Sequence, residues 1–451
     1  MGKSKKKTKA GRSTTATGQK SGATSSAGLE SDGRTSAMSS LSDEEDDQLS
    51  HATHLSLDDD LESIAPDDDV GELCQSEPTE TAESVLEQKL QENLENATHK
   101  TSSIRLAALK NVQALLSRYI MCEQLSNYKM TTFDVIERAL KKGTPGEQVV
   151  ALKMTALVTV QLGTDISDIL ENLLSIIRVQ CADPSLHVDY RAECATVLGL
   201  CSFVAVDELE PIRQSLQCVR SQWTSVKSGN ASPAMCSLFA AAVSAWALLL
   251  VQMPPRRLEE SLNSDLPKLC SYLDTNQVEI RIAAGETLAL LYELGSTLYS
   301  DSVFRPPNHS HTLERLDTLA NDSLKYRAKK DRRVQRSTFR QIYAGVASGA
   351  APSLCVKFGG GESLELDRWS TKLVYDLCCS VLRSGMNSHL KKNELLRDIF
   401  ALGPPLPAGN ARNGADMSKS ERLAMHQSND KIRSQMRAKQ RSKRLASFSL
   451  G

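Results

Sequence analysis

Residues 281–291 read RIAAGETLALL, and four other segments of the chain follow a similar pattern. The pattern returns every 43 to 47 residues, with a small residue at the fourth position and an apolar residue at the last. The five segments are Arg105–Leu115, Gln148–Val158, Arg191–Cys201, Leu238–Leu248 and Arg281–Leu291. Small residues let packed helices approach closely, and apolar residues at helical spacing bury one face. A period in the forties is typical of armadillo and HEAT repeats.

This spacing predicts an all-α, armadillo/HEAT-like solenoid with a small carboxy-terminal helical domain that contains a β-hairpin, flanked by disordered tails. A solenoid offers a long surface for binding a large partner and no inherent pocket for chemistry. The expected divisions are a tail at 1–82, helical repeats at 83–303, a final repeat with a basic helix at 304–348, a carboxy-terminal domain at 349–405, and a linker with a second basic helix at 406–451.

Charge is sorted into blocks along the chain, although the net charge is only −1. Residues 1–20 hold seven basic residues and no acid, residues 43–72 hold thirteen acids and no base, and residues 412–451 hold ten bases and three acids. Such blocks are typical of tails and interaction surfaces. Ser40 and Ser42 precede an acidic run, so we regard them as phosphorylation candidates. A solvated spacer is the alternative interpretation of this segment.

Several boundaries follow from turn residues and propensity. Helical periodicity begins near Ser84, and the chain from 313 to 346 reads as one strongly basic helix. Residues 354–358 and 363–366 flank Gly359-Gly360-Gly361 and predict a β-hairpin, and helices are expected at about 371–383 and 388–401. Ala234–Val251 has no charge, but it lies in register with the repeat and is expected to be a buried solenoid helix rather than a membrane span.

No arrangement of residues indicates catalysis. The chain has no nucleophile elbow, Walker loop, H-E-x-x-H motif or paired carboxylates, and His309-Ser310-His311 has no nearby cysteine partner. The 11 cysteines include no C-x-x-C pair, and we expect them to be reduced thiols. We therefore expect no enzyme activity, metal, cofactor, small-molecule substrate or membrane partner.

Two basic elements indicate binding to a polyanion. Residues 325–340 hold eight basic residues against one acid: Lys325, Arg327, Lys329, Lys330, Arg332, Arg333, Arg336 and Arg340. Lys329, Arg333, Arg336 and Arg340 are spaced 4, 3 and 4 apart and share one helical face, while Phe339, Ile342 and Val346 lie on another and can anchor the helix. Arginine forks bind phosphate bidentately. A solvated, salt-bridged face is the alternative.

The second basic element, Lys431–Arg444, is basic on nearly every side. It contains Lys431, Arg433, Arg437, Lys439, Arg441, Lys443 and Arg444. Such a helix repels itself in water, and phosphates could order it in a negatively charged groove. Nuclear localisation is a competing interpretation of Lys439–Arg444 and of Lys3–Lys9.

Several motifs resemble the interferon-related developmental regulator family. Ile282–Leu291 looks like its most recognisable repeat helix, and Asp134–Arg138 with Leu140–Gly143 looks like an earlier one. Arg327-Ala328-Lys329, Gln335-Arg336-Ser337 and Phe339-Arg340 are similar to its basic helix. The signature of its carboxy-terminal domain is similar to Ser384-Gly385-Met386, His389-Leu390, Asn393-Glu394, Leu396-Arg397 and Leu402-Gly403-Pro404.

The resemblance covers about residues 83–444 and implies an armadillo-like protein without catalytic activity. It implies association with translationally inactive ribosomes, through ribosomal RNA and ribosomal proteins, with the carboxy-terminal basic helix in the messenger-RNA path. It also implies a role in transcriptional co-regulation during differentiation. We therefore expect a cytoplasmic translational regulator.

Two other functions stay open at this point. The alternative is a nuclear scaffold in which the concave solenoid face holds transcriptional co-repressor proteins. An armadillo-type nuclear-transport adaptor would need a ladder of Asn and Trp residues along successive repeats, and Trp246 alone does not make one.

Overall fold

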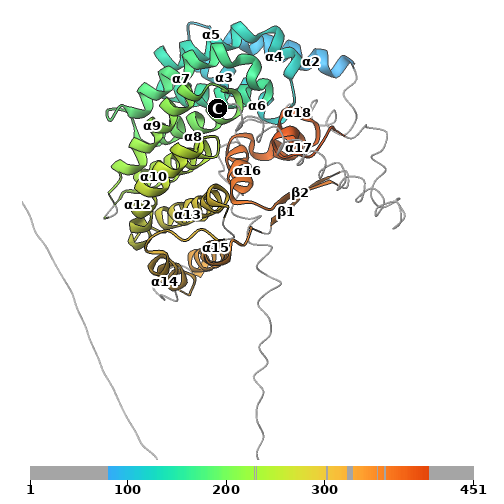
Figure 1. Ribbon diagram of the computed structural model, residues 1–451. Helices are drawn as coiled ribbons and strands as arrows, with labels where there is room; N and C mark the ends of the chain where they lie inside the picture. Colours follow the sequence, from blue (N-terminus) through green and yellow to red (C-terminus); the bar gives the residue numbers. More distant parts are fainter. Residues whose placement is uncertain are drawn as a thin grey trace, which may run out of the picture. The chain divides into compact units, whose positions relative to one another are not determined.

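The computed structural model describes residues 80–405, apart from positions 228, 230, 301–302, 322–328, 353 and 360–361 (Figure 1). The side chains of residues 329–333, inside a helix, are not described either. The expected class, an all-α solenoid with one two-stranded hairpin, is confirmed.

The five repeated segments all lie in one series of helices, which pack against one another in chain order. This inner series comprises α3 (Ser102–Arg118), α6 (Pro145–Leu162), α8 (Val188–Ala205), α10 (Pro233–Leu250), α13 (Val278–Tyr299) and α15 (Lys329–Ser348). Each member contacts the next. The repeat therefore marks the same helix of each unit, as its small and apolar positions require.

A second series of helices covers the first. It comprises α2 (Glu80–Asn96), α4 (Cys122–Asn127), α5 (Lys129–Lys142), α7 (Ser167–Ala182), α9 (Leu209–Ser225), α11 (Pro255–Ser264), α12 (Leu266–Ser271) and α14 (His309–Ala320), with short 3-10 turns η3 (Gly163–Ile166) and η4 (Tyr272–Asp274). The pairs α2–α3, α5–α6, α7–α8, α9–α10, α12–α13 and α14–α15 are in contact. Each repeat is thus an inner helix with its outer partner.

Small residues set how closely the inner helices approach. Ala151 and Ala284, at the fourth repeat position, have no exposed surface, whereas Ala241 at the same position is half-buried. The approach is tightest at Gly199 of α8, where an added β-carbon would lie 2.6 Å from the β-carbon of Ala245 in α10. Any larger residue at position 199 would push these two helices apart.

The α10 helix is apolar and buried. Among the described residues, its sequence is one of two stretches that could cross a membrane by length and composition, the other being Pro145–Ala182. In the structure α10 contacts α8, α9 and α13, and 61% of its apolar window is buried. The expectation of a buried solenoid helix is confirmed.

The arginines that open three of the repeats each bond a backbone carbonyl and a distant side chain. Arg105 and Arg281 donate to a backbone carbonyl just before their own helices, Arg191 donates to one in the last turn of α7, and each also donates to a side chain elsewhere in the repeats. The partners are Lys100 O and Glu147 for Arg105, Cys181 O and Gln222 for Arg191, and Thr275 O and Gln335 for Arg281. Since the guanidinium offers five donors in a fixed fork, one side chain can join a turn to another part of the repeats.

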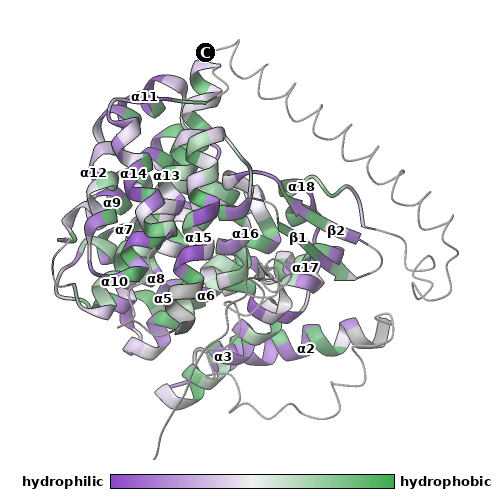
Figure 2. Cartoon of the chain, turned by 90° about the horizontal axis from the view of Figure 1, so that it is seen from below, coloured by the Kyte–Doolittle hydropathy of each residue, from purple (hydrophilic) through white to green (hydrophobic). Residues whose placement is uncertain are grey.

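The carboxy-terminal segment folds back over the inner helices. It comprises β1 (Leu354–Gly359), β2 (Glu362–Leu366), α16 (Trp369–Leu382), η5 (Arg383–Gly385), α17 (Met386–Lys392) and α18 (Glu394–Ile399). The strands pair antiparallel, with Val356 opposite Leu364. The α16 helix contacts α3, α6, α8, α10 and α13, and Figure 2 shows the hairpin beside α17 and α18. This segment therefore packs on the repeats themselves.

Two expected helices are interrupted. The single basic helix expected from 313 to 346 is wrong, because α14 ends at Ala320 and α15 begins at Lys329. Asn321 Nδ2 bonds the Asp317 carbonyl, and such side chains compete with the helical ladder. The helix expected from 388 to 401 is likewise divided into α17 and α18 at Asn393.

Candidate nucleic-acid interface

One face of the basic helix α15 is fixed to the repeat core. Phe339, Ile342 and Val346 have no exposed surface, which confirms the expected anchor. Gly285 of α13 makes room for them, since an added β-carbon there would lie 2.9 Å from Ile342 Cδ1 and 3.0 Å from Phe339 Cε1. Burial of each large apolar side chain stabilises the fold by about 1.5–3 kcal/mol. The part of the helix from Phe339 to Val346 is therefore held against the repeat core.

A buried polar contact adds to this anchor. Arg281 of α13 and Gln335 of α15 are 4% and 2% exposed, and the Arg281 guanidinium donates to the Gln335 side-chain oxygen. The same guanidinium donates to the Thr275 carbonyl at 2.9 Å. Because a buried charge is costly unless hydrogen-bonded, these partners set the rotation of α15 about its axis.

The other face of α15 carries the predicted arginine row. Arg340 is exposed, Arg336 is half-buried, and neither makes an ion pair within the described part of the chain. Arg336 Nε is enclosed and has no hydrogen-bond partner there. Positions 329, 333, 336 and 340 share one face of the continuous helix, as their spacing predicts. The Arg340 guanidinium is therefore available to a ligand, and the part of Arg336 that is exposed lies beside it on the same face.

Many predicted site residues lie outside what the structure describes. Nothing is described of the side chains of Lys329, Lys330, Arg332 and Arg333, and Lys325 and Arg327 are outside altogether. The same holds for the phosphorylation candidates Ser40 and Ser42 and for the second basic element, Lys431, Arg433, Arg437, Lys439, Arg441, Lys443 and Arg444. Their roles stay predictions.

The Ser384-Gly385-Met386 motif attaches the carboxy-terminal segment to the end of α3. An added β-carbon at Gly385 would lie 1.8 Å from the Ser117 carbonyl oxygen, so only glycine fits. Ser117 Oγ donates to the Leu382 carbonyl at 2.8 Å. His389 Nε2 lies 3.1 Å from the same Ser117 oxygen, and burial lowers the pKa of His389 to about 4. The imidazole is therefore neutral near pH 7 and can donate to that carbonyl.

Asn393 attaches the segment to α6. Its side-chain amide donates to the Val160 carbonyl at 3.0 Å, and its oxygen accepts from the Leu396 backbone N–H at 3.1 Å, capping α18. Asn393 Nδ2 also lies 3.2 Å from His389 Nδ1. One buried side chain thus ends α17, begins α18 and holds both to the second repeat.

Arg397 joins the end of the segment to the hairpin. Its side chain is 1% exposed and pairs with Glu362 of β2 at 2.7 Å. It also donates to the carbonyls of Leu390 at 2.8 Å and Gly403 at 2.7 Å. A buried guanidinium with this many acceptors fixes β2, α17 and the Gly403 turn relative to one another.

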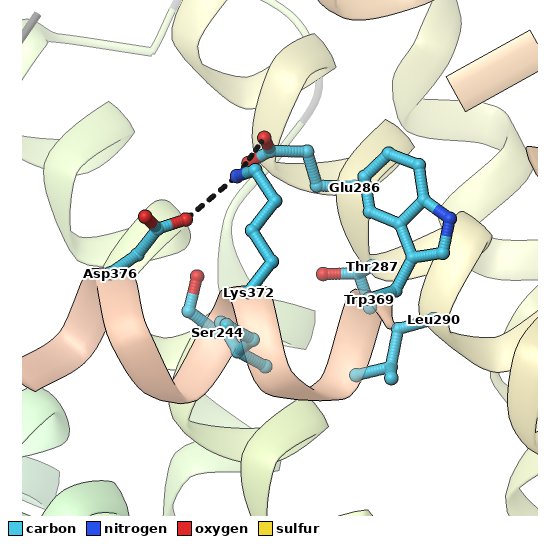
Figure 3. Close-up of a pocket in the computed structure, with 8 residues that line it drawn as sticks. Ser244, Glu286, Thr287, Leu290, Trp369, Lys372 and Asp376 are labelled. Carbon is cyan, nitrogen blue, oxygen red and sulfur yellow. Dashed lines mark hydrogen bonds and ion pairs between the residues drawn. The ribbon is translucent and has the colours of Figure 1, made fainter. Parts of the chain in front are cut away.

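Charged contacts attach α16 to α13. Lys372 Nζ lies between Glu286 at 2.9 Å and Asp376 at 2.7 Å, beside a small hollow between the helices (Figure 3). Burial alone would lower the pKa of Lys372, but the two carboxylates raise it above its ordinary value. Glu293 accepts from the backbone N–H groups of Trp369 at 2.7 Å and Ser370 at 3.3 Å, at the positive end of α16.

Comparison with known proteins shows the family of this chain. The profile of the interferon-related developmental regulator family matches residues 48–347. The chain belongs to the interferon-related developmental regulator family. A second profile, the interferon-related protein conserved region, matches residues 393–445, which begin at Asn393 and run through the second basic element. The resemblance read from the sequence is thus confirmed.

Curated relatives support the same family. Interferon-related developmental regulator 1 of Sus scrofa and that of Homo sapiens are each 34% identical over 410 residues, covering 89% of this chain and 89% of theirs. Interferon-related developmental regulator 2 of Mus musculus is 35% identical over 379 residues, covering 80% of this chain and 85% of its own. These family members are named as regulators, not as enzymes.

Some structural residues were not found from the sequence. Glu286 and Glu293 of α13, and Ser117 of α3, hold the carboxy-terminal segment, yet they were not singled out. Ser117 and Glu293 stand at the same place, twelve residues after the opening arginine of their repeats. A polar residue at this place on an inner helix is therefore a signal, available in the sequence, for contact with the carboxy-terminal segment. Among the described residues no group suited to a metal is present, and His309 lies 3.2 Å from the Tyr292 hydroxyl.

Proposed function

We propose that this family member is a non-catalytic translational regulator that binds ribosomes. The arginine row of α15 contacts ribosomal RNA phosphates, and the basic segment Lys431–Arg444 occupies the messenger-RNA channel. Messenger RNA cannot then enter, so the bound ribosome stays inactive.

The observation that carries the proposal is the contrast between the two faces of α15. Phe339, Ile342 and Val346 are buried, while Arg340 is exposed and unpaired within the described part of the chain. A rigid row of guanidiniums suits a fixed array of phosphates, because little conformational entropy is lost when it binds. Each phosphate neutralised also releases counterions.

The nuclear scaffold remains the alternative, but the face it needs is occupied. In that interpretation a partner peptide lies along the inner helices, where α16 of the same chain contacts α6, α8, α10 and α13. A peptide would have to displace α16 together with the Lys372 and Glu293 contacts. The arginine row requires no such displacement.

Co-sedimentation with purified ribosomes at several salt concentrations tests the proposal. We expect Arg336→Gln with Arg340→Gln to weaken binding and to reduce the slope of log affinity against log salt by about 1 to 2. The charge-matched control is Lys141→Gln with Arg213→Gln, two residues that are already ion-paired within their own helices, and it should behave as wild type. Thermal unfolding confirms that each variant is folded.

Deleting residues 418–451 tests the channel segment separately. We expect the truncated protein to unfold at the wild-type temperature but to bind ribosomes more weakly and with a smaller salt slope. If it co-sediments as well as the full chain at every salt concentration, the channel part of the proposal is wrong. If wild type itself does not co-sediment, the ribosomal role is wrong.

A further inference from the structure

Three lysines form an exposed surface at the hairpin and the end of α17. Lys357 lies on β1, and Lys391 and Lys392 end α17; all three are exposed. Within the described residues none of the three makes an ion pair, although Glu365, Glu394 and Asp398 are exposed on neighbouring elements. We call these three residues the lysine surface.

Several cations on the outer helices are already neutralised by an acidic neighbour. Lys141 pairs with Glu137, Arg213 with Glu210 and Arg257 with Glu260, each within one helical turn. Such pairs are typical of solvent-exposed helix faces. None of the three residues of the lysine surface makes such a pair within the described residues, so their ammonium groups are available to an anion.

The lysine surface is held in place from beneath. The buried Arg397 bonds Glu362 of β2 and also the Lys391 carbonyl at 3.3 Å, which joins the hairpin to α17. Gly359, with φ of +97°, lies against Lys391, whose Nζ is 2.8 Å from the place that a β-carbon would take. Lys391 therefore reaches the strand only two residues beyond Lys357. The cations are pre-positioned rather than scattered.

The lysine surface is joined through Arg397 to the last described residues of the chain. Arg397 also donates to the carbonyls of Gly403 at 2.7 Å and Pro404 at 3.1 Å. The chain that follows holds ten bases and three acids between 412 and 451. A polyanion bound to the lysine surface would also attract the basic residues that follow in the sequence.

We infer that Lys357, Lys391 and Lys392 form a second contact surface for the phosphodiester backbone of RNA, beside the base of the carboxy-terminal basic segment. The inference rests on the proposed ribosomal role and extends it. RNA that receives the basic segment would continue across the hairpin. The negative end of the α17 dipole would favour lysines at positions 391 and 392 even without a ligand. Lys357 lies on a strand, so the helix dipole does not account for it.

The test compares three full-length proteins: wild type, Lys357→Gln/Lys391→Gln/Lys392→Gln, and the charge-matched control Lys141→Gln/Arg213→Gln/Arg257→Gln. Binding to purified ribosomes and to a 30-nucleotide single-stranded RNA is measured across salt concentrations. Three lost phosphate contacts should lower the salt slope by about 2 to 3 units, and the control should keep the wild-type slope. A Lys→Arg triple variant should restore binding.

Each outcome decides the inference. A triple Gln variant that matches wild type on both ligands overturns it, while wild-type ribosome binding would leave the proposed function standing. If wild type fails to bind ribosomes, the proposed function falls and the single-stranded RNA arm alone decides. If the triple variant is unstable, Lys357→Gln/Lys392→Gln replaces it in the test, because this double variant keeps the Lys391 contact with Gly359. Its salt slope should fall by about two-thirds as much as that expected for the triple variant.

Discussion

The carboxy-terminal segment is attached to the repeats in two different ways. At α3 and α6 the attachment is neutral, through the Gly385 approach, His389 and Asn393. At α13 it is ionic, through Lys372 and Glu293. Neutral buried hydrogen bonds require close approach and tolerate no displacement, whereas charges act over longer distances and are screened by water and salt. The two attachments should therefore fail under different conditions.

The largest effect is expected from Gly385→Ala. The new β-carbon would meet the Ser117 carbonyl oxygen at 1.8 Å; that oxygen is a backbone atom and the backbone fixes the β-carbon, so neither can rotate away. We expect the free energy of unfolding to fall by more than about 3 kcal/mol, measured by denaturant unfolding. Gly229→Ala is the control, because an added β-carbon there meets nothing within 4 Å. Equal stability of the two variants would show that α17 does not depend on this approach.

The second largest effect is expected from a change of pH, which should reduce the stability of the neutral attachment. Burial lowers the pKa of His389 to about 4, below its ordinary value of 6.5. Between pH 6.5 and 4 the unfolded chain therefore binds more protons, so stability is complete above 6.5 and is lost as the pH falls. At pH 4.5 the expected loss is about 2.5 kcal/mol.

His389→Gln isolates this titration from the others in the chain. The variant should be less stable than wild type at pH 7, but the difference between them should shrink as the pH falls toward 4. Hydrogen exchange should show where the structure opens: as the pH falls, wild-type α17 should lose protection at a higher pH than α16. A constant difference across this pH range would mean that His389 does not titrate in the way its burial requires.

Removing Lys372 tests the ionic attachment. In Lys372→Met the two carboxylates of Glu286 and Asp376 are left facing each other, but their side chains are 34% and 38% exposed, so water screens them. We expect a loss of about 1–2 kcal/mol, less than for a fully buried pair. High salt should reduce the difference from wild type, because it screens the remaining repulsion. Lys141→Met, which breaks an exposed pair, should cost under about 1 kcal/mol.

The same contrast explains what could be predicted from the sequence. The inner helices follow from local spacing, and Phe339, Ile342 and Val346 were found because helical periodicity places them on one face. The signature around Gly385 was noticed, but its partners were not. His389 and Ser117 are 272 positions apart, and no local pattern links them.

Two helix ends that differ from the predicted helices have a local cause. Asn321 and Asn393 each end a helix that apolar spacing would have continued. Both side chains bond backbone groups, so they compete with the helical ladder and favour a break. In the interface, the arginine row was predictable because it is periodic, whereas the lysine surface joins a strand to a helix that only the fold brings together.

The smallest effect should come from Glu293→Gln, which keeps an accepting oxygen but removes the charge at the start of α16. Glu293 accepts from Trp369 N at 2.7 Å and from Ser370 Oγ at 2.7 Å, so glutamine can retain one of these bonds. The lost interaction with the helix dipole is worth about 0.3–1 kcal/mol. Glu293→Ala, which removes both oxygens, should cost more and should raise hydrogen exchange at the first turn of α16 while leaving α17 protected. If exchange rose equally in both helices, the two attachments would form one cooperative unit, and the distinction between neutral and ionic ends would have no consequence for how the segment opens.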